Sequence, residues 1–428
     1  MKRALISQMK NEWASNLWLV IELAIVTCAI LYLSWFLGVK IYSYTRHQPV
    51  HIDNVYLAEV RTLPPDSPIY VDMGEEAGGN YGADLLTLVS RLRELDYVEE
   101  VAYGRNAAPY YYGCYNFALF DTQDPDSIDI NVNTRYVSTD YPKVFRLSSI
   151  DGKSPEQLSD ILRKGEVIIS IAEYTANRRK GDPTGLDLVG KEVKSKWSRG
   201  EDAPATVGAI IPTIRRTDFE YDPWSGTQLV PLDENPSAAE ASQMVMIRVK
   251  PGKGADLTDD FYSSPQLRML RNVSLLNLRP ITRDRDSVQE LETRQMRLSI
   301  AQIILLLSIV FLGLLGTFWF RVQGRTGEIA LRKVCGASPL QISQRLLGEG
   351  AILLTASLLP VAIFAAWIIP SLKESALQGY FYYNDSVKIM WLSFASGVAI
   401  MYLLVIIGIW FPMRRAMKIR PAVALKQE

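Results

Sequence analysis

The chain has 428 residues, which is long for one average domain and predicts at least two structural units. Its 46 Lys and Arg residues balance its 46 Asp and Glu residues, so the formal net charge is zero. A nucleic-acid-binding protein normally carries a basic excess, so the balance argues against that class.

The charges are distributed very unevenly along the chain. Four apolar stretches, at 17–39, 298–320, 351–369 and 389–411, contain Glu22 as their single charged residue. A helix of about 20 apolar residues crosses the hydrocarbon core of a bilayer. We therefore expect a membrane α-helical protein with four transmembrane helices, and a purely soluble enzyme is excluded.

Lys and Arg in the short loops set the expected orientation, because positively charged short loops stay in the cytoplasm. They are frequent in 1–16, 321–350 and 412–428, and sparse in 370–388. Both ends are then inside, and a large α+β extracytoplasmic domain is inserted between helices 1 and 2. The expected order is a cytoplasmic N-terminal segment at 1–16, transmembrane helix 1 at 17–39 (a retained anchor), the extracytoplasmic, periplasmic domain at 40–286, a stalk and transmembrane helix 2 at 287–320, a cytoplasmic coupling loop at 321–350, transmembrane helix 3 at 351–369, a short extracytoplasmic loop at 370–388, transmembrane helix 4 at 389–411 and a cytoplasmic tail at 412–428.

The large domain shows two β-α-β patterns at its two ends. Strands are expected at 54–60 and 97–103 around a helix at 84–95, and again at 244–249 and 273–278 around a helix at 254–269. This repetition predicts one subdomain built from sequence-distant halves. Between them lies a β-rich insert near 126–217, with strands expected at 127–132, 166–170, 192–196 and 205–211. Residues 287–297 lack Pro and Gly and are expected to form a stalk helix that continues into helix 2.

The cytoplasmic loop carries clear helix signals. A short helix is expected over 327–335, because Glu328 in the first turn and Arg332 and Lys333 in the last turn complement the helix dipole. Gly336 is the expected left-handed stop.

A second helix is expected directly after this stop. Ser338 can cap it, Pro339 occupies its first position, and the helix runs over 340–349 towards helix 3. The loop is then a hairpin of two helices. It either anchors two membrane helices as a charged interfacial loop or docks a cytoplasmic partner.

Several motifs resemble phosphate-binding, metal-binding or catalytic sites. Residues 185–192 nearly match a phosphate-binding loop, but Glu192 replaces the required Ser or Thr, and a Gly turn that enters a strand is the better interpretation. The only histidines, His47 and His51, could ligate a metal, but Pro49 between them disfavours a helix that would bring them together. A catalytic triad would have to use one of these same two histidines.

Three further features remain open to two interpretations. Glu22 is either hydrogen-bonded within the helix bundle or part of a proton relay. The tyrosine-rich run at 110–115 is either a core or β-edge cluster or a ligand or partner surface. Cys28, Cys114 and Cys335 lie in different expected compartments and are not expected to pair with one another.

The loop and the C-terminal tail resemble the MacB/FtsX-like permeases of ABC transporters. The run from Gly327 to Ser338 matches that family's Gly-Glu-Ile…Arg…Gly-Ala-Ser loop, with Cys335 where Leu is commoner. The tail at 414–426 resembles the terminal Arg-Arg-Ala…Ile…Pro…Ala-Leu-Arg pattern. The layout of one span, a large outer domain and three spans also agrees.

The resemblance implies a permease subunit that is not an enzyme and holds no cofactor, because ATP is bound by a separate cytoplasmic ABC ATPase. The implied partners are this ATPase, a second permease subunit in a homo- or heterodimer, the lipid bilayer and a periplasmic or outer-membrane protein, with no nucleic acid. The implied location is the cell inner membrane, with multiple passes and a MacB-like periplasmic domain. The residues implied to dock the ATPase are Gly327, Glu328, Arg332, Lys333, Gly336, Ala337 and Ser338.

The function implied is therefore coupling of ATP hydrolysis to movements of the outer domain, which drives efflux or mechanotransmission. The alternative is a membrane sensor with an extracytoplasmic ligand-binding domain. A membrane-anchored outer hydrolase is a poorer third candidate, because the chain has two histidines and shows no recognisable nucleophile motif.

Overall fold

The computed structural model describes residues 13–46, 48–72, 81–111, 115–122, 129–172, 176, 182–195, 204–220, 225–232, 242–374 and 384–418. The chain divides into two compact units. We call residues 1–42 and 292–428 the helical unit, and residues 43–291 the α/β unit.

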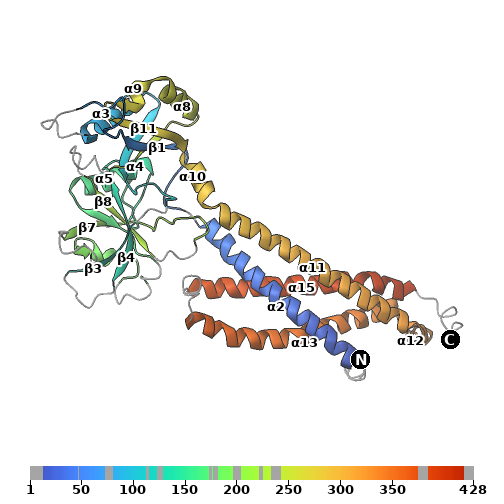
Figure 1. The fold of residues 1–428 in the computed structure, drawn as a ribbon. Helices are drawn as coiled ribbons and strands as arrows, with labels where there is room; N and C mark the ends of the chain where they lie inside the picture. Colours follow the sequence, from blue (N-terminus) through green and yellow to red (C-terminus); the bar gives the residue numbers. More distant parts are fainter. Residues whose placement is uncertain are drawn as a thin grey trace. The chain divides into compact units, whose positions relative to one another are not determined.

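Four of the described helices are long and apolar enough to cross a membrane (Figure 1). They are α2 (Trp13–Thr45), α11 (Glu290–Gly324), α13 (Pro339–Glu374) and α15 (Asn384–Lys418), with the short helix α12 (Thr326–Val334) between α11 and α13. Four apolar helices were the expectation from the sequence. The structure thus supports the membrane α-helical part of the predicted fold class.

One apolar core joins all the helices of the helical unit. It contains Leu23 and Ile30 of α2, Leu314 and Phe318 of α11, and Leu353 of α13, all nearly inaccessible to solvent. Helix α15 contributes further methionine and aliphatic side chains to the same cluster. Small residues let these helices approach closely, as is usual in membrane bundles. A Cβ on Gly350 would lie 2.3 Å from the Ile409 side chain, so a larger residue would force the α15 side chain to move.

Three helix boundaries differ from those expected. Helix α15 continues through Pro412 to Lys418, because Met413 and Met417 pack on the bundle core and favour further helical turns. Helix α13 is a single helix from Pro339, so the second loop helix and the third span are one element. The expected stalk helix is interrupted at the buried Gln289, where α10 (Ile281–Val288) ends and α11 begins.

The α/β unit contains 11 described strands in one continuous sheet. The strands are β1 (Val55–Thr62), β2 (Val98–Arg105), β3 (Tyr115–Asp121), β4 (Ile130–Val137), β5 (Val167–Ile169), β6 (Glu192–Ser195), β7 (Ala205–Ile210), β8 (Gly226–Pro231), β9 (Met244–Val249), β10 (Met269–Leu270) and β11 (Val273–Pro280). The helices are α3 (Tyr81–Arg93), α4 (Tyr141–Val144), α5 (Pro155–Arg163), α8 (Gly254–Ser263), α9 (Pro265–Arg268) and α10, with a 3₁₀ turn η1 (Leu186–Leu188).

The two ends of this unit interleave in the order β10-β11-β1-β9-β2. Strand β1 lies between β11 and β9, and β2 pairs with β9, all antiparallel. Side chains of α3 and α8 cover one face of these strands, and side chains of α4 and α5 belong to the core on the other. The prediction of one subdomain built from distant halves is therefore confirmed. The prediction of one helix over 254–269 was wrong in one respect. The helix is broken at Ser264, because a residue that precedes a proline, here Pro265, disfavours helical geometry.

The remaining strands close into a ring in the order β4-β3-β6-β7-β5-β8, because β8 also pairs in parallel with β4. Apolar side chains from these strands, including Val132, Ile169 and Val207, form a separate core. The strands of this ring run from β3 to β8, a wider range than the β-rich insert expected near 126–217. The sequence interpretation also missed α5, which Ser154 and Gln157 begin with a complete capping box.

Candidate functional site

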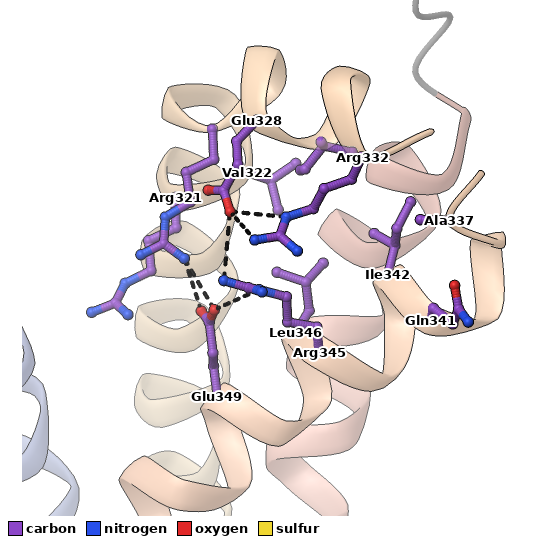
Figure 2. Close-up of a pocket in the computed structure, with 12 residues that line it drawn as sticks. Arg321, Val322, Glu328, Arg332, Ala337, Gln341, Ile342, Arg345, Leu346 and Glu349 are labelled. Atoms are coloured by element: carbon purple, nitrogen blue, oxygen red, sulfur yellow. Dashed lines mark hydrogen bonds and ion pairs between the residues drawn. The ribbon is translucent and has the colours of Figure 1, made fainter. Parts of the chain in front are cut away.

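A cavity of about 180 Å³ lies where α11, α12 and α13 meet (Figure 2). Only charged, polar and aliphatic side chains line it. They are Arg321, Val322, Arg325, Glu328, Ile329, Arg332, Ala337, Gln341, Ile342, Arg345, Leu346 and Glu349. Three of these, Glu328, Arg332 and Ala337, are among the residues that the sequence predicted for partner docking.

The turn between α12 and α13 is the hairpin expected from the sequence. Gly336 has φ +91°, in the left-handed region. The Gly336 amide donates to the Lys333 carbonyl at 3.1 Å, and the Ala337 amide donates to the Arg332 carbonyl at 2.9 Å. This pair of bonds is a Schellman motif, which satisfies the last carbonyls of a helix. Helix α12 therefore ends where Gly336 was expected to stop it.

Helix α13 then begins with a reciprocal cap. The Ser338 hydroxyl accepts from the Gln341 amide at 3.3 Å, and the Gln341 side-chain oxygen accepts from the Ser338 amide at 3.0 Å. Pro339 is the first residue of the helix. The cap expected at Ser338 is thus confirmed, with Gln341 as its partner.

Glu349 is the central acid of the cavity. Its side chain is only 4% exposed, and both carboxylate oxygens lie 3.1 Å from the same Arg325 nitrogen. The Arg345 guanidinium lies 3.8 Å from one of these oxygens. Because a buried carboxylate is costly unless paired, these contacts connect the start of α12 to α13.

Glu328 forms the second half of the same network. Its carboxylate accepts from Arg332 Nε at 3.0 Å and from Arg332 Nη2 at 2.8 Å, one turn further along α12. Arg345 of α13 reaches the same oxygen at 3.5 Å. Arg345 therefore bridges the two acids, and Figure 2 shows the resulting chain of contacts across the cavity.

The other predicted docking residues have structural roles in the hairpin. Lys333 donates to the carbonyl of Met417 near the C-terminus of α15 at 2.7 Å, which ties α12 to the fourth span. Gly327 lies in the first turn of α12. Gly336, Ala337 and Ser338 form the turn described above.

Sequence reasoning missed Arg325, Arg345 and Glu349 as members of this site. The arginines were counted only for their charge in the loop. A signal was available in the spacing of Arg345 and Glu349, which lie one helical turn apart. The pairing of Glu349 with Arg325 spans 24 positions and has no local signature.

A different face of the hairpin is apolar and exposed. Leu331 and Val334 of α12 are 56% and 61% exposed, and Leu340 of α13 is 64% exposed. At 100° per residue, Leu331 and Val334 lie on another side of α12 from the cavity-lining residues 325, 328, 329 and 332. We call Leu331, Val334 and Leu340 the apolar edge.

Aromatic rings and arginines gather near the same end of the bundle. The rings of Trp319 and Phe411 stack with centroids 5.7 Å apart. The Arg415 guanidinium lies 4.2 Å from the Trp319 ring centroid, and Arg414 lies 4.8 Å from that of Trp410. Trp and Arg are typical of the membrane–water interface. We call these residues, with Phe411, the aromatic belt.

The phosphate-loop look-alike at 185–192 is the turn expected from the sequence. The Gly190 amide donates to the Val207 carbonyl, and the Val207 amide donates to the Lys191 carbonyl. These bonds hold the turn against β7, and β6 begins at the next residue, Glu192. His47 lies outside the described residues. Among the residues that the structure describes, no cluster of three His, Cys, Asp or Glu could hold a metal.

Two other open features are now placed. Tyr110 is buried, and its hydroxyl donates to Asp218 at 2.9 Å, so it is a core residue; residues 112–114 lie outside the described part. Burial and the Asp218 carboxylate raise the pKa of the Tyr110 hydroxyl. The Glu22 carboxylate faces α11, where a Cβ on Gly313 would lie 3.2 Å from it.

The four apolar helices and their core define a multi-pass membrane protein. Residues 300–421, which include the cavity, the hairpin, most of α11 and all of α13 and α15, match the model of the FtsX-like permease C-terminal family. The chain therefore carries an FtsX-like permease domain, consistent with a MacB/FtsX-like ABC permease, and the resemblance seen in the sequence is confirmed at that level. No curated protein matches the chain in sequence.

Proposed function

We propose that this chain is the permease subunit of an ABC transporter and that the α12–α13 hairpin docks a separate cytoplasmic ATPase. FtsX-like permeases typically work with an ATPase partner, which supports this class of partner. In this proposal ATP is bound and hydrolysed by that partner, and the chain itself is not an enzyme.

The observation that carries the proposal is the apolar edge. Its three aliphatic side chains are more than half exposed, yet they sit on a hairpin fixed by a Schellman motif and a helix cap. Exposed aliphatic groups on a preorganised element are typical of a protein interface, because burying them costs little ordering entropy. The half-exposed Glu328 and Arg332 then supply polar contacts at the rim, as predicted from the sequence.

The contacts inside the helical unit give a route for transmitting force. A displacement of α12 would act on α13 through Glu328 and Arg345, and also through Arg325, at the start of α12, and Glu349. Helix α11 is continuous from Glu290 to Gly324 and would carry the displacement along its length. We infer that ATP-driven closure of the ATPase moves the α/β unit in this way. The movement would serve efflux or mechanotransmission across the cell inner membrane. The chain would act in a homo- or heterodimer with a second permease subunit.

The test is co-purification from native membranes, followed by measurement of nucleotide hydrolysis and identification of the retained proteins. Leu331→Asp combined with Leu340→Asp is expected to reduce ATPase retention at least about thirtyfold, which corresponds to about 2 kcal/mol for two truncated contacts. Ile150→Asp, at an exposed apolar position of the α/β unit, is the matched control and should have no effect.

Charge reversal tests the polar rim separately. Glu328→Arg combined with Arg332→Glu keeps one acid and one base on α12 but reverses their order. If this variant and the apolar-edge variant both retain the ATPase and its turnover at the original level, the docking assignment is wrong. If no nucleotide-hydrolysing protein co-purifies with the unaltered chain, the sensor hypothesis is favoured instead.

A further inference from the structure

We propose that the cavity between α11, α12 and α13 binds the phosphate group of an anionic phospholipid. This site is distinct from the apolar edge and does not depend on the docking of an ATPase.

The cavity has more positive than negative charge. Four arginines and two glutamates line it, which leaves an excess of two positive charges. Both glutamates already face arginines: Glu349 contacts Arg325 and Arg345, and Glu328 contacts Arg332 and Arg345. An anion that enters the cavity therefore meets more guanidinium groups than carboxylates. Guanidinium forks match the oxygens of a phosphate better than the point charge of a lysine does.

The aromatic residues beside the cavity indicate that it lies at the depth of lipid headgroups. Arg321 lines it and is only two residues from Trp319 of the aromatic belt, and its guanidinium lies 5.8 Å from the Phe318 ring centroid. Tryptophan rings lie at the level of the headgroups in membrane proteins. The apolar part of α11 ends at Phe320, which is 73% exposed, so the lipid-facing surface reaches the rim of the cavity.

The cavity is far larger than a single water molecule, as binding of a phosphate group requires. Its volume of about 180 Å³ is many times the ~10–15 Å³ that one water molecule requires. Apolar side chains also contribute to its wall, including Val322, Ile342 and Leu346. Basic pockets between membrane helices with such mixed walls are suited to an anionic headgroup and the first carbons of its chains.

The geometry favours a lipid over an acidic segment of a partner protein. The cavity-lining residues of α12 and the apolar edge occupy different sides of that helix. A partner seated on Leu331 and Val334 therefore lies on another side of α12 from Arg325 and meets the half-exposed Arg332 only at the rim. Phe320 directly precedes the cavity-lining Arg321, so we expect a lipid beside Phe320 to approach the cavity from the bilayer.

The experiment uses the purified full chain in nanodiscs and native mass spectrometry to count retained lipids. The probes are phosphatidylglycerol, phosphatidylcholine as the zwitterionic comparison, and inorganic phosphate as a soluble competitor. We expect phosphatidylglycerol to be retained at least about tenfold more tightly than phosphatidylcholine. Millimolar inorganic phosphate should not displace it, because the acyl chains also contribute to binding.

Three variants locate the binding site. Arg321→Gln combined with Arg332→Gln removes the excess charge and should abolish the tenfold preference. Arg414→Gln combined with Arg415→Gln removes the same charge at the same end of the bundle, outside the cavity, and should keep it. Ala337→Phe should fill the cavity without changing its charge and should also abolish the preference, which protects the test against misfolding of the arginine variant.

Four results would overturn the proposal. They are equal retention of the two lipids, equal loss of the lipid preference in the Arg321/Arg332 and Arg414/Arg415 variants, displacement of the lipid by inorganic phosphate, and an unchanged lipid preference in both the Arg321/Arg332 variant and Ala337→Phe. The third would indicate a soluble anion, and the fourth would show that the lipid binds outside the cavity.

Discussion

Replacing Gly336 tests how the hairpin is held, because this residue permits the turn between α12 and α13. Its φ of +91° is unfavourable for residues with a Cβ atom, whereas a Cβ placed there would meet no atom within 4 Å. The cost of a substitution is therefore backbone strain alone, without a steric clash. For Gly336→Ala we expect about 1–2 kcal/mol, because that is the typical penalty of the left-handed conformation.

The strain has a local readout. The amides of Gly336 and Ala337 donate the two hydrogen bonds of the Schellman motif, so they exchange with solvent only when the turn opens. A penalty of about 1–2 kcal/mol increases the open population roughly five- to thirtyfold. Hydrogen exchange of the full chain in nanodiscs should show faster exchange by this factor at residues 336 and 337, with little change in the interior of α13.

The order of three substitutions makes the test stringent. Asparagine tolerates the left-handed region better than alanine, and valine tolerates it worst, so exchange should accelerate in the order Gly336→Asn, Gly336→Ala, Gly336→Val. Ser338→Ala is a matched control, because it removes the cap of α13 but leaves the φ of Gly336 unchanged. Unchanged exchange in Gly336→Val, or faster exchange in the asparagine variant than in the alanine variant, would refute the reasoning.

Three further predictions concern other parts of the chain. Glu349→Gln should lower the free energy of unfolding by about 2–4 kcal/mol, whereas Glu328→Gln should lower it by less than about 1 kcal/mol, because the two side chains are 4% and 36% exposed. Equal melting temperatures of the two variants would contradict this. In the α/β unit, burial raises the pKa of Glu59 but hydrogen bonds from neighbouring Arg and Asn side chains outweigh it, so the folded pKa lies below its usual 4.5. Its stabilisation is present above pH 4.5 and is lost as the pH falls through the lower folded value, so Glu59→Gln should flatten that part of a melting-temperature profile, and an unchanged acid limb would count against the assignment. A membrane-impermeant maleimide should label a cysteine placed at the exposed Asp160 in intact cells but reach the exposed Cys335 only after permeabilisation; labelling of both from one side would overturn the proposed topology.

The hairpin shows which features can be predicted from nearby residues. A glycine followed two positions later by Ser338 and Pro339 signals a helix stop and a new helix, since each bond involved spans only a few residues. The same logic would have found α5, whose start at Ser154 and Gln157 carries a capping box that the sequence interpretation overlooked.

Pairings between distant residues were not predictable in the same way. Nothing near β8 in the sequence indicates that it pairs in parallel with β4. Closure of the ring was therefore not predicted, and the expected β-rich insert ended before β8. The pairing of Glu349 with Arg325 was missed for the same reason, although each residue lies next to a span that was predicted. In both cases the partner is fixed by how whole elements pack.

The amino-acid sequence by itself determined the four apolar helices, the helical hairpin and the resemblance of residues 300–421 to the FtsX-like permease C-terminal family, because apolar runs, caps and short motifs act over a few consecutive residues. Only the tertiary structure decided that Glu328 and Arg332 share a cavity with Arg345 and Glu349, and that the exposed apolar edge lies on a different face. The physical reason is that burial and charge pairing depend on which surfaces meet in space. That information resides in the packing of α11, α12 and α13 together.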